Sequence, residues 1–537
     1  MIYKDIRVPM PEKKIIYRFN QKFNITYVYY TVKAYRNKSG KPTSKVVAIG
    51  KKDIESGQLI PNENYFNLFK NAKKPTPAVD LPQSSVGIPK QVQSIGNPVV
   101  MHEIAQQTQL LATLKKTFPH KWEKILAVAS YMISEGNVMM YIDDWFDETK
   151  VDFTDRFSDV ECSRLFESIT KEDMHFFFTE WMKCRKDKEY LVYDVTSISS
   201  YSQNLDLVEW GYNRDDDKLP QINFGMFYGM TSGLPVYYHT YNGSIPDKTS
   251  FKYMMLNAID VGVEDVCFVF DKGNSTAENI DFMYENDYTF VTSMSGTRVD
   301  AVNLIDEVKG KIEKTRNWIP GYNVFGVQLP IELQGREIHA HIYFNPAKRA
   351  YDIMEMTSHI DKLKKELEKV NKAKYATKRF TDYFIIDEHS KNSLSFTLDE
   401  DKVDEKISRT GFFILLSSEK KLTSEEVLKI YRNKDVIEKN FEQFKNYLDF
   451  KRLKTHHNKT TEGKMFTGFV ALILRSYMSQ IIRTAPEMKN YTFEKVMLEL
   501  KKIKSVKMTK GKDIILPLTK TQKTILACLK IDEKTFI

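Results

Sequence analysis

Apolar and polar positions alternate along the chain with two different periods, which predicts an α/β protein. Residues 26–50 carry two β-rich runs around the turn NKSGKP, a pattern typical of a β-hairpin, within an N-terminal region that we take as 1–70. Residues 71–98 are rich in Pro, Ser and Gly and predict a linker. Residues 99–187 follow helical periodicity, and Thr170 with Asp173 forms a capping box before an amphipathic helix.

From residue 188 onward, strand-like runs dominate the pattern. Three consecutive β-rich runs are followed by a helix, a strand, a helix and a strand up to residue 296. This order predicts a mixed sheet flanked by helices. We expect a catalytic core from 188–296 and 410–450, interrupted by a β-containing insertion over 297–409. A mainly helical, Lys-rich region over 451–537 should follow, and Thr423 with Glu426 forms a second capping box inside the core.

Composition narrows the class of protein without identifying it. A chain of 537 residues predicts several domains, and a net charge of +9 permits a nucleic-acid partner without requiring one. The four cysteines form no C-x-x-C pair, which favours a reducing compartment. The N-terminus has no apolar signal segment, and the apolar run 465–482 contains Arg475, so we expect a buried core helix. These features predict a cytoplasmic protein with no membrane partner.

Two aspartates occupy positions where a carboxylate is unusual. Asp194 lies inside an otherwise apolar strand, YLVYDVTSIS, and Asp271 ends the apolar run VCFVF just before a small polar turn. Carboxylates near the ends of neighbouring strands are a common way for open α/β sheets to place a ligand. For either aspartate alone, a turn or cap residue is the alternative interpretation.

A third candidate acid lies in the segment IYRNKDVIEKNFEQFKNYL. At about 100° per residue, four side chains share one stripe roughly 60° wide: Tyr431, Lys434, Glu438 and Lys445. An adjoining apolar stripe is wide enough to seat the helix on a sheet: Ile437, Phe441, Phe444 and Leu448. An ordinary amphipathic helix with surface ion pairs would show the same spacing.

The four polar positions resemble the Y-x2-R-x3-E-x6-K signature of the DDE transposases of bacterial insertion sequences, with Lys434 in place of Arg. The strand of Asp194 resembles the family's first catalytic strand, and VCFVFDKGNSTAENI resembles its second. The stretch before Glu438 is similar to the insertion domain of the insertion sequence 4 superfamily. The resemblance covers roughly residues 98–485.

This resemblance implies an RNase H-like core and metal-dependent chemistry on DNA. Asp194, Asp271 and Glu438 would bind two Mg²⁺ ions, with Mn²⁺ as a substitute, for cleavage at transposon ends and strand transfer of the 3′-hydroxyl. Tyr431, Lys434 and Lys445 would hold phosphates of the DNA, although a lysine lacks the bidentate fork of arginine. The implied partners are the terminal inverted repeats and target DNA, bound by a homodimer in the bacterial nucleoid.

Candidate DNA contacts also lie outside the core. Lys501, Lys502 and Lys504 belong to a basic run that could contact phosphates or form a solvated tail. Trp318 could stack on an unpaired base, with a hydrophobic anchor as the alternative. The helical region 99–187 is a candidate for recognising the terminal repeats. Two other functions stay open: a nuclease that cuts without joining, and a host-adopted DNA-binding derivative without strand transfer.

Overall fold

The chain folds as two units, Met1–Gly87 and Ile88–Ile537, which pack around separate hydrophobic cores. The computed structural model describes residues 3, 6–37, 40–70, 72, 88–184, 190–263, 266–333, 335–369, 378–387 and 395–536. Residues 73–87 of the predicted linker lie outside the described residues. Its last part is not a linker but contains a strand, β5 (Pro89–Ser94).

The first unit is an antiparallel sheet covered by one short helix. Its elements are β1 (Ile15–Asn20), β2 (Ile25–Arg36), β3 (Pro42–Lys52), β4 (Leu59–Pro61) and α1 (Glu63–Leu68). The predicted hairpin is confirmed as the antiparallel pair β2–β3, within the order β1-β2-β3-β4. Val28, Ile49 and Leu59 are buried against Tyr65 and Phe66 of α1, which gives this unit its own small core.

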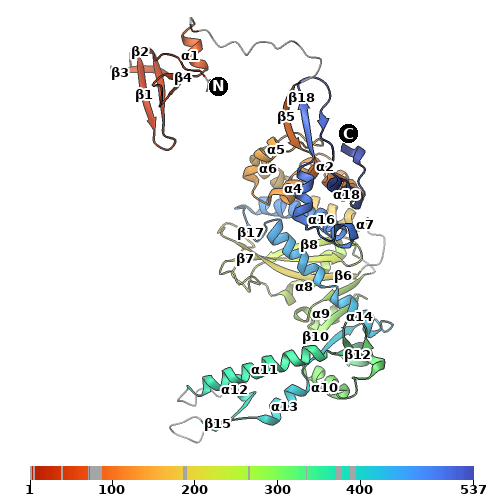
Figure 1. Ribbon diagram of the computed structural model, residues 1–537. Coiled ribbons are helices and arrows are strands. Elements are labelled where there is room, and N and C mark those ends of the chain that lie inside the picture. Colours follow the sequence, from red (N-terminus) through yellow and green to blue (C-terminus); the bar gives the residue numbers. More distant parts are fainter. Residues whose placement is uncertain are drawn as a thin grey trace. The chain divides into compact units, whose positions relative to one another are not determined.

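The second unit is built around one large mixed sheet (Figure 1). Its strands are β6 (Tyr190–Ser200), β7 (Gln221–Gly229), β8 (Leu234–Asn242), β9 (Cys267–Phe270), β10 (Thr289–Met294), β11 (Trp318–Ile319), β12 (Val324–Leu333), β13 (Arg336–Phe344), β16 (Phe412–Ser417) and β17 (Arg452–Leu453). Five of them follow the order β8-β7-β6-β9-β10. β6, β7 and β8 are antiparallel neighbours, whereas β9 and β10 run parallel to β6. This is the RNase H-like strand arrangement, so the predicted mixed α/β sheet is confirmed.

The predicted insertion contains two structurally different parts. Its two β runs form β12 and β13, which continue the large sheet because β13 pairs with β16 and β16 pairs with β10. The other part is an arm that extends from the sheet in Figure 1. It consists of α11 (Pro346–Leu367), α12 (Lys378–Thr381), β14 (Phe384–Asp387), β15 (Ser395–Leu398) and α13 (Glu400–Ser408). The arm has its own small core around Leu363, Leu367 and Phe380.

Helices cover the sheet, with α7 and α16 on one side and α8 and α9 on the other in Figure 1. The helices of the second unit outside the arm are α2 (Gly96–Gln107), α3 (Leu110–Thr117), α4 (Trp122–Glu135), α5 (Ile142–Glu148), α6 (Asp159–Ser168), α7 (Lys171–Lys183), α8 (Asp247–Asp260), α9 (Ala277–Glu285), α10 (Val299–Val308), α14 (Ser424–Arg432), α15 (Asp435–Glu442), α16 (Asn458–Thr484), α17 (Phe493–Lys501) and α18 (Lys520–Cys528). The helical pattern predicted for 99–187 is confirmed by α2 to α7. Both predicted capping boxes are present, before α7 and before α14.

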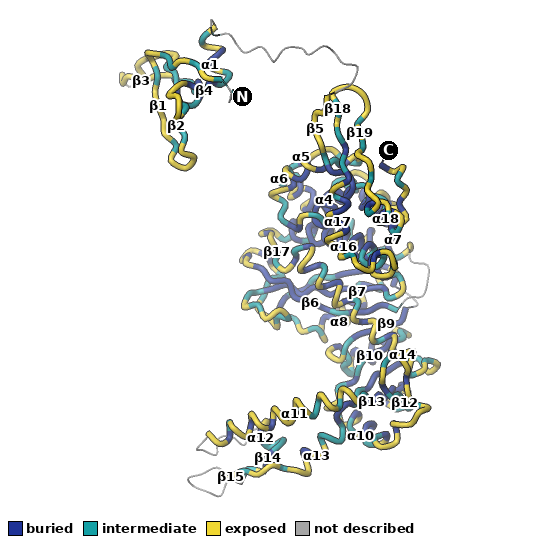
Figure 2. The backbone as a smooth tube through the Cα atoms, viewed as in Figure 1, coloured by how far each residue is buried: buried dark blue, intermediate teal, exposed yellow. Residues whose placement is uncertain are grey.

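The apolar run 465–482 lies within α16, at the centre of the helical layer. In the described part of the chain, α16 is the only unbroken helix long and apolar enough to cross a membrane, and 78% of its apolar window is buried inside the protein. Figure 2 shows this burial, which continues into the sheet, whereas α11 is exposed along most of its length. The predicted core helix is therefore confirmed.

The Lys-rich segment near the C-terminus is not a loose helical tail. It forms β18 (Lys504–Met508), which pairs with β19 (Ile514–Ile515) and with β5 in a three-stranded sheet. Ser505 is buried, whereas its two neighbours in the strand are partly exposed. One face of β18 therefore packs against the rest of the protein. Lysine alone carries no strand signal, so only the pairing with the distant β5 determines this structure.

Candidate active site

Asp194 and Asp271 lie level with each other on neighbouring parallel strands. Val192 of β6 is paired with Val269 of β9, and each aspartate stands two residues further along its strand. Side chains two residues apart share one face of a strand. The two carboxylates are therefore presented on the same face, as expected from their places in the sequence.

Asp271 has many polar partners. Its Oδ1 accepts hydrogen bonds from the Lys272 N–H at 2.8 Å, the Tyr431 hydroxyl at 2.8 Å and Ser293 Oγ at 3.2 Å. Its Oδ2 lies 3.3 Å from the ammonium of Lys434. Burial acts to raise the pKa of this carboxyl, but the Lys434 charge and the hydrogen bonds outweigh it and hold the pKa below its usual value.

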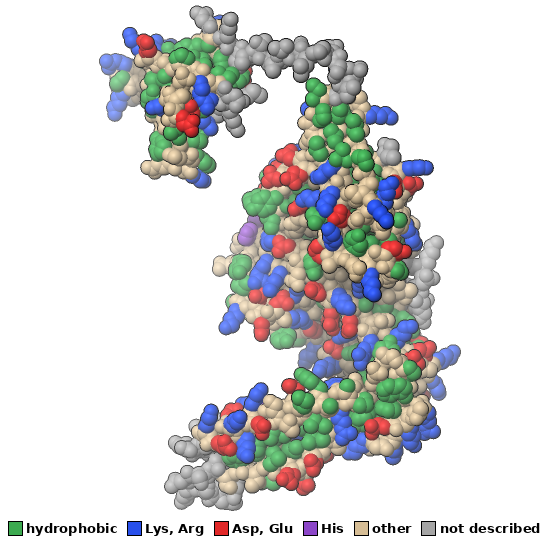
Figure 3. Space-filling view, in the orientation of Figure 1, with side chains coloured by type: hydrophobic (Ala, Val, Ile, Leu, Met, Phe, Trp, Pro, Cys, Tyr) green, Lys and Arg blue, Asp and Glu red, His purple; other side chains and the backbone are tan. Residues whose placement is uncertain are grey.

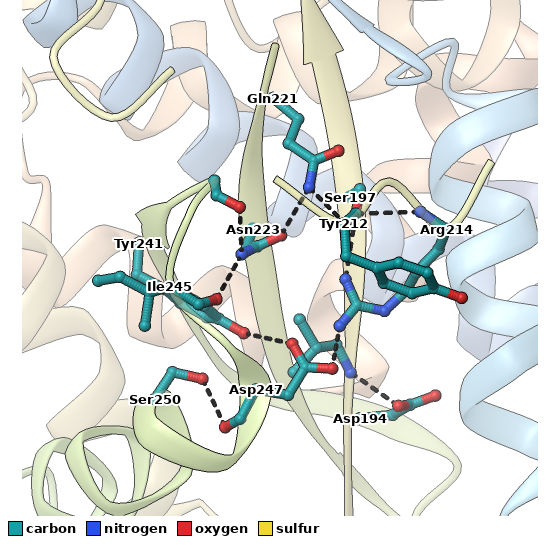
Figure 4. A network of polar contacts seen from close by, with 12 residues as sticks. Asp194, Ser197, Tyr212, Arg214, Gln221, Asn223, Tyr241, Ile245, Asp247 and Ser250 are labelled. Carbon is teal, nitrogen blue, oxygen red and sulfur yellow. Dashed lines mark hydrogen bonds and ion pairs between the residues drawn. The ribbon is translucent and has the colours of Figure 1, made fainter. Parts of the chain in front are cut away.

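Asp194 is far less well compensated. In the described part of the chain its one hydrogen bond comes from the Val195 N–H, at 2.8 Å (Figure 4). Burial raises the pKa of Asp194 to about 6, against the opposing charges of Lys434 and Arg214. The Arg214 guanidinium itself is engaged by Asp247 and Ser197. Asp194 is thus the carboxyl whose ionised form has the least support.

The expected single helix through Glu438 is wrong, although its apolar stripe is confirmed. The segment consists of α14, a break at Asn433 and Lys434, then α15, and finally a π-helical turn, η4 (Gln443–Tyr447). Four apolar side chains are buried as predicted: Ile437, Phe441, Phe444 and Leu448. Phe444 stacks on Phe224 of β7 at 5.0 Å between ring centroids, which seats this segment on the sheet.

Lys434, at the break, connects two of the candidate acids. Its ammonium lies 3.3 Å from Asp271 Oδ2 and 3.8 Å from Glu438 Oε1, while its own side chain is largely buried. Asp194 is close enough that its pKa is lowered by Lys434 and raised by Asp271. Two of the candidate acids therefore contact one ammonium group, and the third lies within reach of its electrostatic influence.

Lys445 does not lie beside Glu438. Because the helix breaks at residue 433 and widens into a π turn, a constant rotation per residue does not apply. The Lys445 ammonium lies 2.7 Å from Asp215 Oδ2, in the loop between β6 and β7, and the residue is only 7% exposed. Burial lowers the pKa of Lys445, although Asp215 opposes this effect. The expected stripe of Tyr431, Lys434, Glu438 and Lys445 is thus replaced by two separate ion-pair groups.

With this geometry established, comparison with known proteins identifies the family. The family model described as "Transposase DDE domain" matches residues 185–474, which is more than half of the chain. The chain belongs to this family. The match includes Asp194, Asp271 and Glu438 together with the insertion between the last two.

The other comparisons add little to this family assignment. One solved structure with similarity is the cryo-EM structure of the piggyBac transposase synaptic complex with hairpin DNA, at 9% sequence identity and a TM-score of 0.36. That likeness covers 77% of this chain and 82% of the other. The RNase H-like fold rests on the strand order rather than on this likeness. No curated protein matches the chain.

The donor atoms of the transposase domain suit a hard divalent cation, although they do not surround one position. Among the described residues, no three His, Cys, Asp or Glu side chains lie close enough together to hold a metal ion. Asp271 and Glu438 instead share the Lys434 ammonium, and Asp194 is an under-compensated carboxyl beside them. Carboxylate oxygens are the ligands that Mg²⁺ prefers, and it needs few of them. The residues therefore fit the metal in the chemistry of their donor atoms, but the described side chains do not form a ready-made set of ligands.

The remaining expected DNA contacts are mostly engaged within the chain. Lys501 lies 2.9 Å from Glu135 and Lys502 lies 2.8 Å from Glu499, while Lys504 is half-buried in β18. Trp318 is 37% exposed and packs edge-on against Phe325, with 4.9 Å between ring centroids. On the side shown in Figure 3, Lys and Arg side chains are interspersed with Asp and Glu, in agreement with the modest net charge.

Several site residues were missed from the sequence. Ser293 of β10 follows Thr292, which is paired with Phe270, so it lies level with Asp271 on the next strand. A polar side chain in the run YTFVTSM is the signal that could have indicated it. Arg214 and Asp215 belong to a segment, NRDDDK, whose charge is typical of any solvated loop. Their partners, Asp247 and Lys445, are distant in sequence and give no local signal.

Proposed function

We propose that this member of the DDE family is a transposase that cleaves DNA at transposon ends and joins the 3′-hydroxyl to target DNA. The observation that carries the proposal is that Lys434 bridges Asp271 and Glu438, two acids from separate elements, while Asp194 lies on the strand beside Asp271. Asp271 and Glu438 contact its ammonium, and Asp194 stands level with Asp271 on the adjacent strand. Three carboxylates gathered at one edge of an RNase H-like sheet are suited to metal-dependent phosphoryl transfer.

Asp194, Asp271 and Glu438 are the residues that would hold Mg²⁺, or Mn²⁺ in its place, as the pair of ions common in such sites. When bound, the metal supplies activation of the attacking hydroxyl and stabilisation of the leaving oxygen. The chain contributes orientation. Tyr431 and Ser293 fix Asp271 Oδ1, and Lys434 reduces repulsion between Asp271 and Glu438.

Contacts to the DNA backbone follow from the same groups. Tyr431 and Lys434 lie beside the acids and are placed to contact phosphates near the reacting one. The Lys445 ammonium is paired with the Asp215 carboxylate. A DNA phosphate would replace that carboxylate as its partner, since both groups present anionic oxygens. Lys501, Lys502 and Lys504 would add weaker contacts, because acids of the same chain already neutralise the first two.

The rest of the chain is assigned by what transposition requires. We assign recognition of the terminal inverted repeats to the helical region 99–187 and a supporting role to the insertion over 297–409. Transposition needs two DNA ends at once, which favours a homodimer acting in the nucleoid. These assignments depend on the catalytic one.

A supercoiled plasmid that carries the reading frame with its flanking DNA tests the proposal. With Mg²⁺, the wild-type protein should nick or excise the element and insert it into a second plasmid. Glu438→Gln should lose about a thousandfold in rate, since metal-assisted charge stabilisation is worth several kcal/mol. Glu442→Gln is the matched control, because this exposed residue lies one turn further along the same helix.

Three results would contradict the proposal. Full activity in Glu438→Gln would remove this residue from the chemistry. Cleavage without any joined product would indicate a nuclease, and binding without cleavage would indicate a DNA-binding derivative.

A further inference from the structure

The loop between β6 and β7, residues 201–220, presents aromatic rings to solvent beside the candidate active site. Trp210 is 68% exposed and Tyr212 is 81% exposed. Aromatic rings carry a large apolar area, so two of them left this open within three residues favour a binding role. Neither ring is used by the chemistry proposed above.

The backbone that carries these rings is held firmly. Gly211, between them, packs so closely on Gly243 that an added Cβ would stand 1.9 Å from the Gly243 carbonyl oxygen. The Tyr212 carbonyl accepts a hydrogen bond from the buried Gln221 Nε2 at 2.7 Å, as Figure 4 shows. Glu209 and Gln221 exchange backbone hydrogen bonds at 3.0 and 2.9 Å. The exposure of the rings is therefore a property of a fixed backbone rather than of a loose loop tip.

Positive side chains lie beside the rings. Tyr212 lines a hollow of about 310 Å³ together with Arg214, Lys248 and Gly273. Gly273 stands two residues after Asp271, which places the hollow next to the candidate acids. Asp247 also lines the hollow and pairs with Arg214. Among the described residues Lys248 forms no ion pair, so it is the positive group of the hollow that remains for an anionic ligand. An exposed aromatic ring beside such an ammonium matches the chemistry of a nucleotide.

The far side of the same loop is tied to the segment that follows Glu438. Asp215 pairs with Lys445 at 2.7 Å, and Asp217 pairs with Arg452. Lys445 lies in η4 and Arg452 in β17, so these ion pairs link the loop to the segment that follows α15. The loop is thus positioned from both ends relative to the acids.

We propose that Trp210 and Tyr212 form a stacking platform for bases of the DNA strand next to the cleaved phosphate. The inference rests on the proposed function, because it takes DNA as the substrate. Stacking on an aromatic ring is sequence-tolerant, since every base has a π face. Lys248 would then contact a phosphate of the stacked nucleotides. The base-stacking role expected for Trp318 is reassigned to this loop, because Trp318 is packed against Phe325.

A binding experiment with a paired design tests the platform. The probe is a fluorescent duplex with an unpaired single-stranded end, prepared once with normal bases and once with abasic sites in the unpaired part. Binding is measured by anisotropy for the wild-type protein and for Trp210→Ala/Tyr212→Ala. The double variant should lose roughly tenfold or more in affinity for the base-bearing probe, and little for the abasic probe. The salt dependence of binding should stay the same, because phosphate contacts are unchanged.

Two control variants make the result specific. Trp210→Phe/Tyr212→Phe keeps both ring faces and should retain most of the affinity. Tyr35→Ala removes an exposed ring of β2, in the first unit, and should change nothing.

Failure of the platform and failure of the proposed function give different results. Equal affinity in the wild type and the double variant, or an equal loss on both probes, would overturn the platform while leaving a DNA-binding protein. A change of oligomeric state in the double variant without DNA would also overturn it, since the rings would then contact a second copy. Absence of binding by the wild type to either probe would overturn the proposed function and the platform together.

Discussion

Asp194 and Asp271 occupy equivalent places on neighbouring parallel strands, yet their surroundings differ sharply. Asp271 is contacted by Tyr431, Lys434, Ser293 and a backbone N–H, and its pKa is lowered. Asp194 accepts one backbone hydrogen bond, and burial raises its pKa to about 6. The same side chain thus has opposite tendencies to ionise. The cause is the path of the α14–α15 segment, whose polar side chains reach the strand of Asp271.

The comparison shows that local strand position does not determine the charge state of a carboxylate. The partners that decide it come from residues 293 and 431–434, more than twenty positions away. Asp194 is the acid whose ionised form depends most on an added cation.

The largest predicted effect is on catalysis, where the two acids should behave alike. Asp194→Asn and Asp271→Asn should each lower the rate of DNA cleavage by about a thousandfold, because each would remove a proposed ligand of the metal. Asp300→Asn, at an exposed position in α10, serves as the control. The plasmid cleavage assay measures this, and near-normal cleavage by either variant would separate that acid from the site.

Replacing the two acids should change the free energy of unfolding in opposite directions. At pH 7 with EDTA, Asp194→Asn should raise the free energy of unfolding by up to about 3 kcal/mol, since it removes a poorly compensated charge. Asp271→Asn should lower it by about 1–3 kcal/mol, because Lys434 and Tyr431 lose an ionised partner. Urea unfolding gives both values, and shifts of the same sign would refute the comparison.

The pH dependence of stability should reveal the same asymmetry. Folded Asp194 titrates near 6, whereas the unfolded group titrates near about 3.9, so between these values the folded state holds a proton that the unfolded state has lost. The contribution of Asp194 to the free energy of unfolding therefore falls as pH rises from 4 to 6. The stability difference between wild type and Asp194→Asn, in EDTA, should vanish below pH 4 and be full above pH 6. A difference independent of pH would show that another group causes it.

The smallest predicted effect comes from removing the hydroxyl of Tyr431, which contacts Asp271 and for which Asp194 has no counterpart among the described residues. Tyr431→Phe removes the hydroxyl that donates to Asp271 and lies 2.9 Å from Ser293 Oγ. Supporting contacts of this kind are typically worth about 10- to 100-fold in activity, and we expect the lower end. The Mg²⁺ concentration needed for half-maximal cleavage should rise, while the pH at which Asp194 titrates should move little. Unchanged metal dependence would mean that Tyr431 does not position Asp271.

Much of the fold follows from local pattern. The strands before Asp194 and Asp271 were predictable because a strand that is buried on both faces appears in the sequence as a short continuous run of mostly apolar residues. The capping boxes of Thr170 and Thr423 were predictable because a cap is satisfied by residues three positions away. The apolar stripe of residues 437–448 was predictable because its period reports one buried face.

The sequence by itself determined which faces are buried, and it singled out the acids that we propose for the chemistry, since both depend on side-chain type and short spacing. Only the tertiary structure decided how those residues are paired. Lys445 pairs with Asp215 across a separation of 230 residues, and Lys434 pairs with Asp271 across more than 160 residues as well as with Glu438 four positions further on. An ion pair of this kind depends on the path of the backbone, and the break at residue 433 and the π turn leave no pattern in the spacing of apolar residues. The sequence positions of Asp194 and Asp271 therefore indicated them as candidate acids, whereas the packing around each one decides whether its pKa is raised or lowered.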